Sequence, residues 1–138
     1  MKEIFVDTSA WDAVADKGDP NHGVAMLFKD EITGNYRAVV TNYILDEVST
    51  LLLMNVGYKR TVEFKRVLDA LAQAGIVEVV WVSRDIADEA WSVFEQFNVD
   101  KMWSFTDCVS YVVMKRRGIT EAFVFDRDFA QMGFTCRP

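Results

Sequence analysis

Short apolar runs alternate with longer amphipathic segments along the whole chain, and this alternation limits the fold more than any other feature of the sequence. The apolar runs are continuous rather than interrupted by polar residues at every second position, a pattern typical of strands that are covered on both faces. Strands separated by helices indicate an α/β fold with a mostly parallel sheet. We expect strands at residues 3–6, 36–41, 77–82, 121–125 and 134–136.

Capping residues and glycines mark where the helices between these strands begin and end. Asp7-Thr8-Ser9 opens the first helix, and Thr106 is expected to cap a later helix that has Asp107 in its first turn and Gly118 at its end. We expect helices from Thr8 through Val14, at 22–32, at 43–56 after the cap Thr41 or Asn42, at 58–74, from the cap Ser83 through Phe94, at about 106–117, and at 128–132.

Length and composition indicate one globular domain covering residues 1–138, since 51% of the residues are hydrophobic and no linker interrupts the chain. No segment approaches the ~18 apolar residues of a membrane span, and the first strand begins at once, without a signal peptide. Cys108 and Cys136 lack metal-ligand spacing, so we expect reduced thiols in a cytoplasmic protein. The net charge of −6 argues against a protein that holds nucleic acid by its global charge.

Three aspartates are expected at the carboxyl edge of the sheet, where functional residues gather in folds of this class. Asp7 ends the first strand and Asp126 ends the fourth. Asp107 opens a helix that must run back to begin the fourth strand, so the start of that helix lies at the same edge. The positive end of the helix dipole also favours a carboxylate there. The order of elements therefore predicts that the three carboxylates converge.

Glu47 is a fourth acid predicted at this edge, in the first turns of the helix that follows the second strand. It shares a helical stripe with Ile44, Leu51 and Met54, whereas Asp46 lies on a polar stripe. We therefore expect Glu47 to point inward and Asp46 to point outward. Carboxylates are rarely buried without a partner, and a bound cation is the simplest partner for this one.

Four carboxylates in one pocket repel one another and raise one another's pKa values. Hard divalent cations reverse that cost because they bind oxygen ligands. Mg²⁺ or Mn²⁺ held in this way can activate a water molecule and neutralise charge on a phosphodiester. We expect Asp7, Asp107 and Asp126 to bind the metal directly, and Glu47 to bind it or to orient a bound water.

Four short motifs occur in order over essentially the whole chain. They are Val6-Asp7-Thr8-Ser9, Asp46-Glu47-Val48, Phe105-Thr106-Asp107-Cys108 and Phe125-Asp126-Arg127-Asp128-Phe129. Together they resemble the PIN domain, and most closely the VapC-type toxin ribonucleases. The resemblance implies a single-domain α/β/α sandwich with strand order 3-2-1-4-5. It also implies an acidic quartet of Asp7, Glu47, Asp107 and Asp126, with supporting roles for Thr8, Thr106, Arg127 and Asp128.

The same resemblance implies an activity and a set of partners. The expected activity is Mg²⁺- or Mn²⁺-dependent endonucleolytic cleavage of RNA, leaving 5′-phosphate and 3′-hydroxyl ends. The expected partners are a small antitoxin protein and a second copy of the chain, in a homodimer supported by apolar residues expected on the exposed faces of the second and fourth helices. Arg127 is expected to contact a phosphate, and Asp128 either binds metal or caps the short helix that follows it.

Other enzyme classes fit the sequence less well. A phosphatase with Asp7 as nucleophile would need a second acid two residues later, where Ser9 stands. A phosphoreceiver domain would need an aspartate at the end of the third strand, which ends in Val82-Ser83. Two alternatives within the family remain open. They are a housekeeping nuclease of RNA processing and a non-catalytic module that binds RNA or protein.

Overall fold

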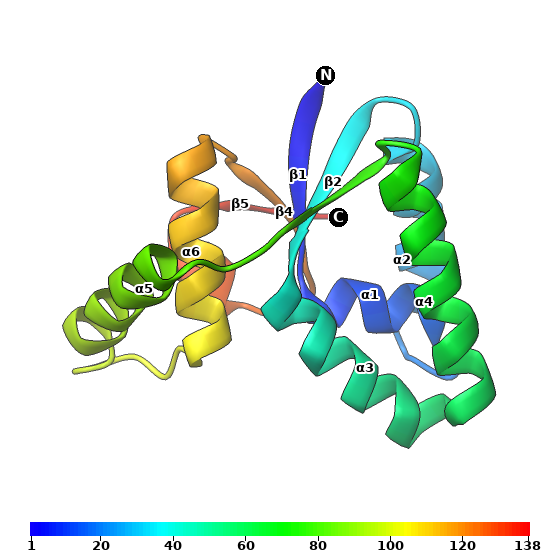
Figure 1. Cartoon of the computed structure of the whole chain (residues 1–138), viewed down its shortest axis with the longest axis horizontal. Helices are drawn as coiled ribbons and strands as arrows, with labels where there is room; N and C mark the ends of the chain where they lie inside the picture. Colours follow the sequence, from blue (N-terminus) through cyan, green and yellow to red (C-terminus); the bar gives the residue numbers. More distant parts are fainter.

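The computed structural model describes residues 1–138 and has three layers (Figure 1). Its middle layer is a five-stranded sheet in the order β3-β2-β1-β4-β5, in which every neighbouring pair is parallel. The strands are β1 (Lys2–Val6), β2 (Tyr36–Thr41), β3 (Val77–Val80), β4 (Glu121–Phe123) and β5 (Thr135–Arg137). The predicted fold class and strand order are both confirmed.

Helices cover both faces of the sheet (Figure 1). One layer contains α1 (Thr8–Ala15), α2 (His22–Ile32), α3 (Asn42–Val56) and α4 (Tyr58–Gln73). The other contains α5 (Arg84–Phe97) and α6 (Phe105–Arg117), which pack against each other, and α7 (Asp128–Gln131) is a single turn between β4 and β5. One cluster of 31 buried hydrophobic residues forms the core. None of the helices combines the length and the apolar character that a membrane span requires.

Two strands end two residues earlier than the apolar runs suggested, because polar side chains bind the backbone that follows them. After β3, the Val82 amide donates a hydrogen bond to Asn42 Oδ1 (2.8 Å) and not to a neighbouring strand. After β4, the Phe125 amide donates to the Ser9 hydroxyl (3.0 Å). Both departures occur at the carboxyl edge of the sheet, where they bring polar side chains of separate segments together.

Most helix ends lie where the capping residues placed them. The Thr41 hydroxyl accepts a hydrogen bond from the Ile44 amide at the start of α3, and the Ser83 hydroxyl accepts one from the Ile86 amide at the start of α5. Gly118 ends α6 in the left-handed conformation, with φ of 67°, which costs glycine little because it has no Cβ.

The expected cap of α6 is wrong. Thr106 lies inside the helix, and the Ser104 hydroxyl is the cap that accepts a hydrogen bond from the Asp107 amide (3.0 Å). Ser and Thr are both good caps, so the two positions look alike in sequence. Phe105 packs against Tyr43 with ring centroids 6.0 Å apart, and this contact fits its place as the first helical residue. Asp107 remains in the first turn of α6, as expected.

The basic residues at the end of α6 lie at the amino edge of the sheet, opposite the carboxyl edge where α6 begins. Arg117 pairs with Glu3 at 2.8 Å and also with Glu78, while Arg37 pairs with Glu3 at 2.6 Å. These contacts link α6 to three neighbouring strands at their amino ends. The basic residues at the end of α6 are therefore separated by the length of the helix from the acids at its start.

Candidate active site

An open cavity of about 400 Å³ lies at the carboxyl edge of the sheet. At this edge β1 and β4 end and α1 and α6 begin (Figure 1). Five of the ten residues that line it are acids: Asp7, Glu47, Asp107, Asp126 and Asp128. The others are Thr8, Ser9, Leu51, Met102 and Ser104. We call this cavity the acidic pocket. It contains all four acids of the expected quartet, and Asp128 as a fifth.

Asp7 forms the buried floor of the acidic pocket and is only 5% exposed. Its amide donates to the carbonyl of Phe123 (3.0 Å), so it continues the pairing of β1 with β4. Its Oδ2 accepts hydrogen bonds from the amide (3.2 Å) and the hydroxyl (2.9 Å) of Ser9, which makes Asp7 the cap of α1. The Ser9 hydroxyl also accepts a hydrogen bond from the Phe125 amide. Ser9 therefore fixes the carboxylate of Asp7 relative to the segment that carries Asp126.

Asp107, Asp126 and Asp128 form the tightest group of carboxylates. Each offers one oxygen that lies within 4.8 Å of the oxygens offered by the other two. Asp126 Oδ1 accepts a hydrogen bond from the Asp128 amide (2.9 Å), which shapes the turn after β4 and brings both side chains to the pocket. Asp128 does not cap α7 with its side chain, since it is the first helical residue.

Glu47 lies in the pocket, although not for the reason that the sequence suggested. The buried stripe of α3 is Ile44, Val48 and Leu52, whereas Glu47 is exposed on the neighbouring stripe. The expectation that Glu47 is buried is therefore wrong. Its carboxylate accepts a hydrogen bond from the Thr8 hydroxyl (2.8 Å), so α1 orients it over the open side of the pocket.

Two of the expected supporting residues lie outside the pocket lining. The side chain of Thr106 does not reach the pocket, and the carbonyl of this residue accepts a hydrogen bond from the Ser110 hydroxyl (3.0 Å). Arg127 is exposed between two lining acids and makes no ion pair within the chain. Its guanidinium is therefore available to a ligand from solvent.

Several lining residues were not singled out from the sequence. Ser9 and Ser104 each fix an acid by a hydrogen bond. Ser9 belongs to the motif Val6-Asp7-Thr8-Ser9, whereas the only sequence signal for Ser104 is its position three residues before Asp107. Met102 is 93% exposed and lines the rim together with Leu51. The spacing of Leu51 places it on the same helical stripe as Glu47, whereas nothing in the position of Met102 indicated that it lies beside carboxylates.

Burial and neighbouring charges raise the pKa values of three acids in the pocket, Asp7, Asp107 and Asp128. Burial, followed by the charges of Asp7 and Asp126, raises the pKa of Asp107 to about 8. Burial also raises the pKa of Asp7 to about 6, although the hydrogen bonds from Ser9 oppose the rise. Burial and the charge of Asp126 raise the pKa of Asp128. At neutral pH the pocket therefore retains protons that a cation could displace.

This donor set suits a hard divalent cation. All the candidate ligands are carboxylate oxygens, with no histidine or cysteine among the lining residues, and Mg²⁺ and Mn²⁺ prefer oxygen. A cation would also offset the burial and the repulsion that raise the pKa values of Asp7, Asp107 and Asp128. The open side of the pocket leaves room for water and for a phosphate group.

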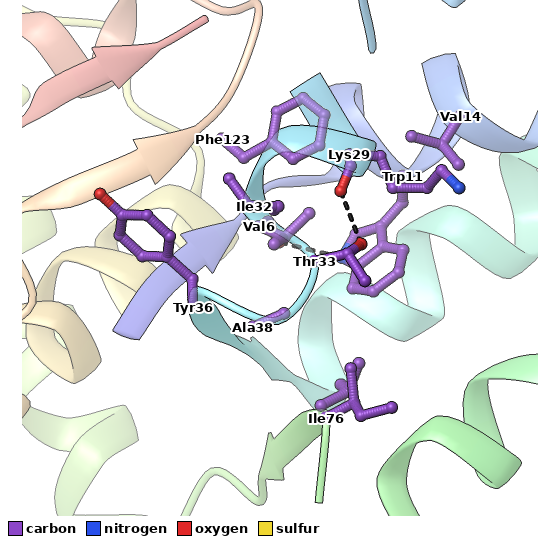
Figure 2. A pocket seen from close by; sticks show the side chains of 11 residues that line it. Val6, Trp11, Val14, Lys29, Ile32, Thr33, Tyr36, Ala38, Ile76 and Phe123 are labelled. Atoms are coloured by element: carbon purple, nitrogen blue, oxygen red, sulfur yellow. Dashed lines mark hydrogen bonds between the residues drawn. The ribbon is translucent and has the colours of Figure 1, made fainter. Parts of the chain in front are cut away.

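A second, apolar pocket lies beneath α2 and carries no comparable chemistry (Figure 2). It measures about 100 Å³, and nine of its eleven lining residues are hydrophobic, among them Val6, Trp11 and Phe123. Its hydrogen bonds serve the fold: the Trp11 indole donates to the carbonyl of Val6 (3.0 Å), and the Thr33 hydroxyl donates to the carbonyl of Lys29 (2.7 Å).

Comparison with known proteins assigns the family. The model of the PIN domain family matches residues 4–135, and this chain belongs to that family. The 23S rRNA-specific endonuclease VapC20 of Mycobacterium tuberculosis is 35% identical over 132 residues, which make up 95% of this chain and 95% of that protein. A VapC ribonuclease of Archaeoglobus fulgidus is 32% identical over 77 residues, covering 56% of this chain and 46% of that protein.

Solved structures agree with this assignment. The crystal structure of M. tuberculosis VapC20, described as a sarcin–ricin loop cleaving toxin, has a TM-score of 0.85 and 32% identity over 96% of this chain and 97% of that chain. VapBC2 of Rickettsia felis, bound to a DNA fragment from its promoter, has a TM-score of 0.66 at 11% identity, covering 97% of this chain and 96% of that chain. At that identity the likeness shows the fold alone. The predicted family is confirmed, and the relatives agree with the predicted ribonuclease activity.

Proposed function

We propose that this protein is a divalent-metal-dependent endoribonuclease and the toxin of a toxin–antitoxin pair. The observation that carries the proposal is the group of Asp107, Asp126 and Asp128, whose oxygens lie within 4.8 Å of one another in a pocket that Asp7 and Glu47 also line. The relation to VapC20 over 95% of both chains supports the activity.

The chain's own residues divide the work of the reaction. Asp107, Asp126 and Asp128 would hold Mg²⁺ or Mn²⁺, with Asp7 as a further ligand on the β1 side. When bound, the cation supplies a water molecule of lowered pKa and neutralises charge on the phosphate. Glu47, which the Thr8 hydroxyl holds by a hydrogen bond, would accept a hydrogen bond from the attacking water and direct it. The water oxygen would bond to phosphorus while the bond from phosphorus to the 3′ oxygen breaks. The water would release a proton to solvent and the 3′ oxygen would take one up, which leaves 5′-phosphate and 3′-hydroxyl ends.

The rim of the pocket offers contacts for RNA that compensate for the net charge of −6. Arg127 is exposed next to Asp126 and can pair with a phosphate that flanks the scissile bond. Met102 and Leu51 offer apolar surface to an unstacked base. Because VapC20 is a 23S rRNA-specific endonuclease, a loop of large-subunit ribosomal RNA is the first substrate we propose.

Exposed apolar residues support the proposed protein partners. Val24 and Leu27 on α2 are 53% and 75% exposed, and Tyr58 and Val67 on α4 are 76% and 59% exposed. Surfaces of this kind suit a homodimer and an antitoxin. We further propose that the antitoxin presents an arginine to the acidic pocket, since a guanidinium can pair with carboxylates in a bidentate way. Both cysteines are free thiols, which fits a cytoplasmic protein.

Analysis of the ends of the products tests the proposed reaction. Purified protein, freed of any copurifying antitoxin, is incubated with labelled 23S rRNA fragments in Mg²⁺, Mn²⁺ or EDTA. We expect cleavage in either metal, none in EDTA, and product ends that a ligase joins without prior phosphorylation. Cleavage that persists after exhaustive chelation, or 2′,3′-cyclic phosphate ends, would contradict the proposed mechanism.

A further inference from the structure

An open groove continues from the acidic pocket along α3, and the proposed reaction does not use it. Its volume is about 470 Å³, and six residues line it: Thr8, Asp46, Glu47, Thr50, Leu51 and Met54. Thr8, Glu47 and Leu51 also line the acidic pocket. The two cavities therefore meet at these three residues. We call this cavity the α3 groove.

One face of α3 supplies five of the six lining residues. Asp46, Thr50 and Met54 recur at intervals of four residues, and Glu47 and Leu51 have the same spacing, so the two rows lie side by side on the helix. Seven residues of helix place Met54 about 10 Å along α3 from Glu47. The groove thus leads away from the acidic pocket along α3, which packs beside α1 (Figure 1).

The α3 groove combines an apolar surface with free polar groups. Met54 is 77% exposed and Leu51 is half-buried. Asp46 and Thr50 are exposed, and neither side chain makes a hydrogen bond or an ion pair within the chain. Glu47 differs from them, because its carboxylate already accepts a hydrogen bond from α1. Asp46 is therefore a free acceptor, and the Thr50 hydroxyl is a free donor, beside an apolar surface.

Charge determines which part of an RNA chain suits the α3 groove. The lining contains two carboxylates, Asp46 and Glu47, and no basic residue, so it repels a phosphate. A base carries no charge, and unpaired bases of RNA are recognised by stacking and by hydrogen bonds to their Watson–Crick edges. Because the groove meets the acidic pocket, a nucleotide next to the scissile phosphate is the part of the substrate that can place its base there.

Guanine matches the free polar groups of the α3 groove better than the other bases do. Its Watson–Crick edge has two adjacent donors, N1–H and the N2 amino group, which one carboxylate can accept together. The neighbouring O6 is an acceptor, to which a hydroxyl can donate. Adenine, cytosine and uracil each present one donor group next to acceptor atoms, which a carboxylate repels.

We propose that the α3 groove is a guanine-binding subsite of the ribonuclease. The base lies against Leu51 and Met54, Asp46 accepts hydrogen bonds from N1–H and the N2 amino group, and Thr50 donates one to O6. This inference rests on the proposed function, because the flanking phosphate must lie in the acidic pocket. The subsite gives the enzyme a preference for guanine at one nucleotide beside the scissile bond.

Binding of RNA to a cleavage-disabled chain tests the subsite. The full chain with Asp107→Asn is titrated in Mn²⁺ with labelled oligouridylates that contain a single guanine, inosine or adenine, and fluorescence anisotropy gives the Kd. We expect guanine RNA to bind roughly tenfold more tightly than adenine RNA, with inosine between them because it lacks the N2 amino group. Adding Asp46→Asn should remove this preference. Adding Asp88→Asn, which changes an exposed acid on α5, should leave it unchanged.

A second pair of variants tests the apolar surface of the groove. Met54→Ala should weaken the binding of all three RNAs, because each base loses the surface against which it lies. Leu53→Ala is the matched control, since Leu53 is the neighbouring residue on α3, is 53% exposed and lies outside the groove lining. It should leave all three Kd values unchanged.

The outcomes separate the subsite from the proposed function. Equal affinity for guanine and adenine RNA, or a guanine preference that survives Asp46→Asn, overturns the subsite even if the wild type cleaves RNA. A guanine preference that depends on Asp46, in a wild type that cleaves no RNA in Mg²⁺ or Mn²⁺, would contradict the proposed function alone. If Asp46→Asn and Met54→Ala leave RNA binding intact but weaken a complex with a co-encoded protein, the groove is a docking surface for an antitoxin and the proposal is wrong.

Discussion

At the scale of single residues, Asp107 has the most perturbed carboxylate in the acidic pocket, because burial and two neighbouring charges raise its pKa to about 8. A raised pKa in the folded state means that the folded protein holds a proton that the unfolded chain has lost. The pKa of Asp7 is also raised, to about 6. The contribution of Asp107 and Asp7 to the free energy of unfolding is therefore fully present below about pH 4, where these residues are protonated in the folded protein and in the unfolded chain alike. This contribution is lost as the pH rises through about 6 and then 8.

The first prediction follows from that sign. In EDTA, the free energy of unfolding of the wild type should fall between pH 5 and 8. Asp107→Asn should flatten the upper part of this fall and leave the metal-free protein at least as stable at neutral pH, with a gain on the order of 1 kcal/mol. Chemical unfolding at a series of pH values measures both. If Asp107 were only a helix-end acid, the same change would instead cost about 0.3–1 kcal/mol.

Ser9 supports a second prediction at this scale. Its hydroxyl donates a hydrogen bond to the Asp7 carboxylate and accepts one from the Phe125 amide. Ser9→Ala therefore removes a hydrogen-bond partner from the carboxylate and from the amide. We expect a loss of about 1–3 kcal/mol in stability and a further rise in the pKa of Asp7. Ser92→Ala, which removes a hydroxyl from the exposed face of α5, is the matched control and should stay within about 0.5 kcal/mol. Equal stability of the two variants would contradict the positioning role of Ser9.

At the scale of helices and strands, the sequence predicted the elements well and the orientation of single side chains less well. Continuous apolar runs gave all five strands, and Thr41 and Ser83 marked helix starts because a cap acts on its own helix. Glu47 shows why burial was harder to predict. Its helical stripe also contains Met54, which is 77% exposed, so this side of α3 faces solvent and not the core. The choice between two adjacent stripes depends on packing partners, which a single sequence does not specify.

The loop before α6 supports a third prediction. The Asn98 side chain makes two hydrogen bonds of 2.8 Å with the backbone of Trp103, and the Trp103 indole donates to Gln131 (3.0 Å). These contacts place Ser104 and therefore the first turn of α6. Asn98→Ala should cost about 1–3 kcal/mol in stability and weaken Mn²⁺ binding, because Asp107 is held less firmly. Calorimetric titration with Mn²⁺ measures the affinity. Asp100→Ala, in the same loop but exposed, should leave it unchanged.

At the scale of the whole molecule, the strand order brings the acids together. β1 and β4 are neighbours at the middle of the sheet, so Asp7 and Asp126 follow adjacent strands, and α6 begins at the same edge with Asp107 in its first turn. The alternation of strands and helices predicted the edge but not which strands are neighbours there. That order came from the resemblance to the PIN domain. Asp128 entered the cluster through the turn after β4, a local geometry that the apolar pattern does not encode.

The most direct test asks whether metal binding and RNA cleavage depend on the same acids. If the acids form one active site, the loss of one of them must impair both. The measurement is the single-turnover rate of cleavage of one RNA as a function of Mn²⁺ concentration, for the wild type and Asp107→Asn. We predict that the wild type saturates with Mn²⁺ and is inactive in EDTA. Asp107→Asn, although as stable as the wild type, should cleave at least about 10²-fold more slowly at every concentration. An Asp107→Asn variant that is active and less stable than the wild type would contradict the proposed site.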